Sequence, residues 1–189
     1  MQSTSGLAVD YIVKETGKPW RARIYVDDEE IAEVRVREDL TYVLTAKNGN
    51  EWTLSARVRG EIRPFSMTVN YAATHDTPVT TSSTEVLTIR DHLFLHNGRF
   101  YMLASTPEGR PLRDFLLGKR YICRLDTFPF SDLTEIDSET LSRLRRIRGT
   151  PVGELEGLGR DGHRVHLPTE LDDIGLPLVA SCYLLYSAA

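Results

Sequence analysis

The sequence is poor in cysteine and has no excess of positive charge. Its 189 residues contain two cysteines, Cys123 and Cys182, and both lie in apolar surroundings. We therefore expect buried, unbridged thiols in a cytoplasmic protein rather than a disulfide framework. A net charge of −4 gives no electrostatic footprint for nucleic acid. The first residues also lack the basic and apolar regions of a signal peptide, so we do not expect secretion.

Recognisable catalytic motifs are missing as well. The sequence contains no G-x-S-x-G, H-E-x-x-H or phosphate-binding P-loop pattern. His75 and Asp76 lie in a stretch rich in hydroxyl side chains, so a hydrolytic site there stays an alternative hypothesis. We expect no cofactor, and the balance of these observations favours a protein that is not an enzyme.

The histidines do not form metal-binding patterns. His92 and His96 lie on one face of a predicted strand, but residues four apart on a strand are separated by ~13 Å, too far to share one metal ion. His163 and His166 fall on opposite faces of another predicted strand. The sequence therefore predicts no metal site.

What the sequence does contain is an alternation of apolar and polar residues with a period of two, which is typical of strands with one buried and one exposed face. Asn48-Gly49 and Asn97-Gly98 separate such segments and indicate tight hairpins, while Asp27 to Glu30 resemble a turn. The polar stretch 72–84 is expected to be a loop. The predicted strands are 21–26, 31–37, 41–46, 51–58, 62–71, 92–96, 99–103, 115–117, 121–125, 152–158 and 164–167. An antiparallel, mainly β domain follows, which closes as a barrel or stacks as a sandwich.

Two helices are predicted near the C-terminal end of the chain. The first is a short amphipathic helix at 137–148, where Asp137 is a suitable N-cap and arginines follow in the last turn. The second occupies about 169–188, and the spacing of Thr169 and Asp172 is that of a capping box. No linker divides the chain, so we expect one domain over 1–189.

The last segment, Leu176 to Ala189, carries no charged residue. A membrane tail, an oligomer interface and a buried core helix are the three interpretations. The uncharged run is short for a bilayer, which needs about 20 residues, and Pro177 interrupts its start. A helix that is apolar all round is expected to be enclosed by protein. We therefore predict a closed antiparallel β-barrel around a central hydrophobic C-terminal helix.

This layout resembles the tubby C-terminal-like superfamily, which includes tubby domains, phospholipid scramblases and the LURP-one-related proteins. His166-Leu167-Pro168 precedes Leu171-Asp172, and the stretch from Ala180 to Leu185 reads ASCYLL, which is similar to the C-terminal helix of scramblases. The specific match covers about thirty residues. The resemblance implies a barrel of about twelve strands around the last helix.

Two functional features of the superfamily do not transfer. Asp161, His163 and Val165 do not reproduce the alternating oxygen ligands of the scramblase calcium stretch. The basic cluster with which tubby domains bind phosphoinositides has no counterpart that can be assigned here. LURP-one-related proteins are the nearest in size.

One basic set is the candidate ligand-binding surface. Arginine side chains can hold lipid phosphates through paired hydrogen bonds. We predict a non-enzymatic binding module for an anionic lipid head group or a partner protein; the alternatives are an enzyme with a pocket at a barrel mouth and a structural or oligomeric protein. Arg57, Arg59 and Arg63 near Trp52 are interpreted as the exposed face of a strand pair. The candidate ligand-binding residues are Lys119, Arg120, Arg143, Arg145, Arg146 and Arg148.

Overall fold

A computed structural model describes most of the barrel and its central helix. The described residues are 8–16, 21–37, 41–58, 65–72, 84–90, 92–104, 119–137, 139, 149–158 and 162–187. They form twelve strands: β1 (Val9–Glu15), β2 (Ala22–Val26), β3 (Glu29–Val36), β4 (Tyr42–Ala46), β5 (Glu51–Val58), β6 (Phe65–Ala72), β7 (Thr84–Arg90), β8 (Leu93–His96), β9 (Arg99–Ala104), β10 (Lys119–Leu125), β11 (Gly149–Gly157) and β12 (His163–Leu167). The helical elements are the 3-10 segments η1 (Leu133–Glu135) and η3 (Thr169–Ile174), and the α-helix α2 (Gly175–Ser187).

The strands form one closed antiparallel barrel. Each strand pairs with the next along the chain from β1 to β12, and β12 pairs with β1 to close the ring. In the closing pair, Val9 lies opposite Leu167 and Val13 lies opposite His163. The predicted barrel is thus confirmed, with twelve strands and no free sheet edge.

The hairpins lie where their turn residues predict them. Asp27 and Asp28 both have positive φ, and so do Asn97 and Gly98, which is the geometry of tight two-residue hairpins. The predicted turn from Asp27 to Glu30 is too long, because Glu29 and Glu30 already belong to β3. β1 and β7 were missing from the individually predicted strands, and the predicted strand at 115–117 lies outside the described residues.

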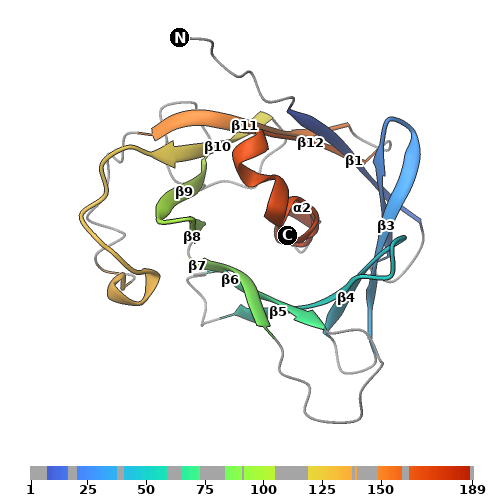
Figure 1. Cartoon of the computed structure of the whole chain (residues 1–189), viewed down its shortest axis with the longest axis horizontal. Helices are drawn as coiled ribbons and strands as arrows, with labels where there is room; N and C mark the ends of the chain where they lie inside the picture. Colours follow the sequence, from blue (N-terminus) through green and yellow to red (C-terminus); the bar gives the residue numbers. More distant parts are fainter. Residues whose placement is uncertain are drawn as a thin grey trace.

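The helix α2 lies inside the ring of strands (Figure 1). Leu178, Val179, Ala180 and Cys182 are fully buried, and Leu184 is 2% exposed. These side chains share one hydrophobic core with the inward residues of the strands. The prediction of an enclosed core helix is therefore confirmed, and its apolar surface on all sides is explained by the surrounding wall.

The start of this helix differs from the prediction. Thr169–Ile174 form the 3-10 segment η3, whose N-cap is Pro168, and no side chain caps its end, so the capping box expected from Thr169 and Asp172 is not made. α2 begins at Gly175, and Pro177 lies in its first turn, where a missing N–H is tolerated. A Cβ atom at Gly175 would come within 2.6 Å of the Tyr11 hydroxyl oxygen, so this close approach requires glycine.

A second apolar cluster covers the outer face of β8, β9 and β10. Phe100 on β9 packs against Phe128 with ring centroids 4.6 Å apart, and Ile136 is 1% exposed. The Arg90 guanidinium donates a hydrogen bond to the Leu133 carbonyl oxygen and so attaches η1 to the barrel. The predicted helix at 137–148 lies outside the described residues except for Asp137 and Glu139.

None of the helices in the described part of the chain combines the length and hydropathy needed to span a membrane.

Candidate functional site

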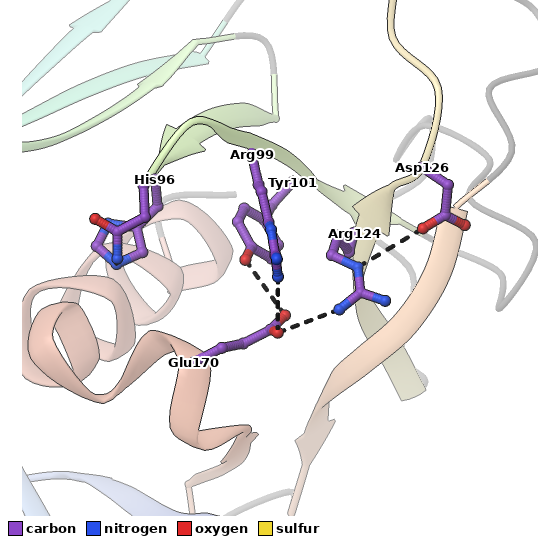
Figure 2. A network of polar contacts seen from close by, with 7 residues as sticks. His96, Arg99, Tyr101, Arg124, Asp126 and Glu170 are labelled. Atoms are coloured by element: carbon purple, nitrogen blue, oxygen red, sulfur yellow. Dashed lines mark hydrogen bonds and ion pairs between the residues drawn. The ribbon is translucent and has the colours of Figure 1, made fainter.

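Polar side chains gather at the two ends of the barrel. The first group, the Glu170 end, lies where η3 leads into α2 (Figure 2). His96 on β8, Arg99 and Tyr101 on β9 and Arg124 on β10 approach η3 from the wall. Their positions alternate with the outward residues that form the second apolar cluster, so the same period of two that builds the wall turns them inward.

Two carboxylates of η3, Glu170 and Asp173, contact these four groups. The Tyr101 hydroxyl donates to Glu170 Oε1 at 3.3 Å, and Arg124 Nη1 lies 3.2 Å from Glu170 Oε2. Arg99 Nη1 lies 3.7 Å from the same oxygen, and His96 Nε2 lies 2.8 Å from Asp173 Oδ1. Figure 2 shows Glu170 at the centre of this network. The arrangement attaches η3 to β8, β9 and β10.

Tyr101 acts as a hydrogen-bond donor at this end. Burial and the negative charge of Glu170 raise its pKa, so the phenol stays protonated. Its ring stacks on Phe94 with centroids 5.1 Å apart. Because its charges are already paired, we interpret the Glu170 end as a structural element that attaches the start of the helix to the barrel wall, and we call it the latch. The isolated charged residues in the strand sequences do not predict this network.

The second group, the Arg120 end, lies at the opposite end of the barrel, near the last turns of α2. Arg120 on β10 alternates with Ile122, which belongs to the central core, and its side chain is buried at 8% exposure. His163 on β12 alternates with Val165 and Leu167 of the same core. A cation and an imidazole thus face the barrel interior from neighbouring parts of the wall.

The histidines at this end are held neutral. Burial, followed by the positive charge of Arg120, lowers the pKa of His92 to about 4. Burial also lowers the pKa of His163; Glu15 opposes this shift and Arg120 adds to it. Nδ1 of His92 is shielded from solvent and has no hydrogen-bond partner among the described residues.

Glu15 and Tyr183 complete the Arg120 end. The Tyr183 hydroxyl on α2 donates to Glu15 Oε1 on β1 at 3.0 Å, and the rings of Tyr183 and His163 lie 6.1 Å apart. On β11, Gly157 lies opposite His163 and brings no side chain, and no described atom lies within 4 Å of a Cβ placed there. A guanidinium and imidazole N–H groups beside open space are donors suited to an anion.

The structure separates the two predicted ligand-binding residues that it describes. Lys119 points outward and pairs with Glu154 on β11 at 2.7 Å, whereas its neighbour Arg120 faces the interior. Arg143, Arg145, Arg146 and Arg148 lie outside the described residues, as do His75, Asp76, Arg59 and Arg63, and nothing is described of the Arg57 side chain.

The positions of the histidines in the barrel decide the remaining predictions about them. His92 lies at the Arg120 end and His96 at the Glu170 end, so they are not a pair. His166 lies on the outer face, 2.6 Å from Asp10, opposite in direction to His163. Among the described residues, no group of three histidine, cysteine or acidic side chains could hold a metal ion.

Both cysteines are buried as unbridged thiols, as predicted. Burial raises the pKa of the Cys182 thiol to about 12. A thiol with this pKa is protonated at neutral pH, so Cys182 is a packing residue rather than a nucleophile.

Several exposed basic residues of the described barrel form ion pairs with carboxylates of other chain segments. Cross-strand pairs join Lys119 to Glu154, Arg164 to Glu156 at 3.5 Å and Arg37 to Glu51 at 2.8 Å. Arg21 likewise pairs with Glu33. These pairs neutralise four exposed basic residues of the described barrel, whereas Arg120 lies with its side chain in the interior.

Comparison with known proteins gives no further guide. No protein-family model, no curated protein and no solved structure matches this chain.

Proposed function

We propose that this protein is a cytoplasmic, non-enzymatic binding module that holds an anionic lipid head group at the Arg120 end of its barrel. The observation that carries the proposal is the inward, buried guanidinium of Arg120 next to two neutral histidines. A guanidinium carries five N–H donors, so Arg120 can donate to a phosphate of the ligand in addition to its contacts within the protein. An imidazole N–H of His163 would be a further donor to the same phosphate.

The electrostatics favour binding over proton-transfer catalysis. A general acid or base works best when its pKa lies near the working pH. His92, with a pKa of about 4, is far from that condition. Glu15 is engaged by the Tyr183 hydroxyl, which orients its carboxylate towards the helix.

The resemblance to the tubby C-terminal-like superfamily supports the same proposal through the layout. That layout implies about twelve strands around an apolar C-terminal helix, and the chain has twelve strands around α2. We propose that the chain is a distant member of this superfamily, with a head-group site built from its own residues Arg120, His92 and His163.

A vesicle-binding experiment tests the proposal. The wild type is expected to float with phosphatidylcholine vesicles that contain phosphatidylglycerol, and not with phosphatidylcholine alone. Arg120→Met should weaken this binding about tenfold or more, because a hydrogen bond to a charged group contributes roughly 1.5–3 kcal/mol. Arg164→Met removes an exposed, paired arginine from the outer face of β12 and should bind like the wild type.

The same assay separates the interior site from the predicted surface site. A variant with Arg143, Arg145 and Arg146 changed to Ser tests binding by that basic segment. Loss of flotation in the serine variant together with full binding by Arg120→Met would place the head group at the segment and overturn the Arg120 site. Thermal unfolding of each variant shows that the barrel is intact.

A further inference from the structure

We propose that a pocket at the Glu170 end of the barrel binds a small aliphatic zwitterion, such as an aliphatic amino acid. The pocket has a volume of about 250 Å³ and lies between the start of β3, the turn that joins β4 to β5, and Leu176 in the first turn of α2. The Arg120 end lies near the last turns of the same helix, where Tyr183 contacts Glu15. The pocket is therefore separate from the head-group site and does not rest on it.

The position of the pocket follows from the way in which the helix start is attached. The latch contacts of Glu170 and Asp173 join η3 to β8, β9 and β10. In the order of the ring, β3 and β4 lie opposite β9 and β10 (Figure 1). The start of α2 is thus attached on one side of the barrel, and the pocket lies between it and the opposite side.

Part of the pocket lining is apolar, because a β-bulge directs an additional side chain of β3 towards the interior. The register of β2 and β3 shifts by one residue beside Ile24, so Ile31 is an extra residue in the pairing. Ile31 packs against the central core, to which its neighbour Ala32 also belongs. Together with Ala46 and Leu176, Ile31 gives the pocket an apolar surface. An aliphatic group that covers this surface is removed from water, which favours binding.

The charged residues of the lining leave one charge of each sign for a ligand. Glu30 is already paired, since its Oε2 lies 3.4 Å from Arg23 Nη1. Glu29 and Lys47 also line the pocket, and within the described part of the chain neither forms an ion pair. An ammonium group of the ligand would meet the Glu29 carboxylate, and a carboxylate would meet the Lys47 ammonium group. A zwitterion uses both charges, whereas a simple cation or anion uses only one.

Hydrogen bonds hold this part of the lining in place before any ligand binds. The Lys47 N–H donates to the Ile31 carbonyl oxygen at 2.9 Å, which joins the turn to β3. Asn48 Oδ1 accepts a hydrogen bond from the Asn50 N–H at 3.0 Å within the same turn. The amide nitrogen of Asn48 is a further donor for the carboxylate of the ligand. A preformed site loses less conformational entropy on binding.

The volume of the pocket limits the size of the ligand. Sites for drug-sized ligands have volumes of about 300–1,000 Å³. This pocket is smaller than that range, which favours a short aliphatic body over a long acyl chain. Leucine meets these conditions, because it combines a branched aliphatic side chain with one ammonium group and one carboxylate.

Leucine and three analogues test the pocket in the wild-type protein. Nitrogen-15 NMR of the full chain follows the backbone amide signals, and each titration gives a Kd. We expect leucine to shift the signals of Lys47, Asn48 and Leu176. Isoamylamine lacks the carboxylate and isocaproate lacks the ammonium group, so each should bind about fivefold more weakly. Glycine lacks the aliphatic side chain and should bind at least about tenfold more weakly.

Matched variants assign the two charges. Glu29→Gln should weaken the binding of leucine and isoamylamine about fivefold and leave isocaproate unchanged. Lys47→Met should weaken leucine and isocaproate to a similar extent and leave isoamylamine unchanged. Glu156→Gln and Arg164→Met each remove one charge of an exposed pair on β11 and β12, so both should bind leucine like the wild type. Thermal unfolding shows that each variant is folded, and the analogue series in the wild type needs no variant.

Three results would overturn the proposal. The first is the absence of shifts at the pocket with millimolar leucine, and the second is a set of shifts confined to another part of the barrel. The third is equal binding of leucine, isoamylamine and isocaproate, which would mean that the two charges do not recognise the ligand. Vesicle flotation tests the head-group site separately, so the failure of one proposal is distinguishable from the failure of the other.

Discussion

At the scale of single residues, Gly175 brings the start of the helix close to Tyr11 of the barrel wall. A Cβ atom at Gly175 would lie 2.6 Å from the Tyr11 hydroxyl oxygen. Gly175→Ala should therefore destabilise the protein by about 1–3 kcal/mol, the usual cost of overpacking, although alanine favours helices. Urea unfolding of the variant measures this loss.

A second substitution tests the cause of that loss. Tyr11→Phe removes the oxygen atom and should recover part of the stability in the Gly175→Ala background, since the next ring atom is 3.4 Å away. Gly157→Ala is the control, because its Cβ would meet no described atom, and its effect should stay within about 0.5 kcal/mol. Equal losses from both glycine substitutions would contradict the contact argument.

The direction of Arg120 could not be predicted from the residues around it. In β10, Ile122 packs in the central core while Cys123 and Leu125 pack in the outer cluster, so both faces of the strand are apolar. Without alternation, the sequence assigns no face to Lys119 or Arg120 and the pair reads as one basic patch. In β12, by contrast, His163 and His166 were correctly placed on opposite faces because that strand alternates.

At the scale of elements, the latch at η3 determines how the helix enters the barrel. Glu170 joins this segment to Arg99, Arg124 and Tyr101 of two neighbouring strands. Glu170→Gln removes the charge from these contacts and should reduce the free energy of unfolding by about 1 kcal/mol, since the side chains of Glu170 and Arg124 are only 28% and 32% exposed. Thermal or urea unfolding at low salt provides the measurement.

An exposed pair provides the matched control for the latch. Glu156→Gln breaks a similar contact to Arg164, 3.5 Å away, between two side chains that are each almost half exposed. Exposed ion pairs contribute little, so its effect should stay below about 0.5 kcal/mol. If Glu156→Gln destabilised the barrel as much as Glu170→Gln, the latch would have no special role.

The helix itself was predictable, whereas its first turns were not. Its uncharged surface required enclosure, and α2 is enclosed. The Thr169 and Asp172 spacing suggested a local cap, but long-range contacts of Glu170 and Asp173 with β8, β9 and β10 hold this segment as a 3-10 turn instead. Such contacts join residues about 46 to 77 positions apart, which no local pattern encodes.

At the scale of the whole molecule, the barrel follows from periodicity and from the need to enclose α2, while the site at its end does not. The Arg120 end unites β1, β10, β12 and α2, and its Tyr183–Glu15 hydrogen bond spans 168 positions. Only closure of β1 onto β12 brings these groups together. The order in which the strands pair is a property of the complete barrel. The residues of this site can therefore be grouped only when the fold is known.

Burial of His92 makes the stability of the barrel sensitive to acid. The folded state keeps His92 neutral, with a pKa of about 4, whereas in the unfolded chain this histidine has its ordinary pKa of 6.5. The unfolded state therefore binds more protons between these values, so stability is full above pH 6.5 and falls as the pH approaches 4. From pH 7.5 to pH 5, we expect His92 to cost the fold ~2 kcal/mol.

Urea unfolding at several pH values measures this loss, and His92→Asn provides the comparison. His92 has a φ of 69°, and asparagine tolerates this left-handed region better than most residues, so the variant should fold. It should show a smaller decline of stability between pH 7.5 and pH 5, with a remaining part from His163, whose pKa is lowered as well. An identical decline in wild type and variant would mean that His92 is protonated in the folded barrel, in which case Arg120 would have to share its end of the interior with a second positive charge.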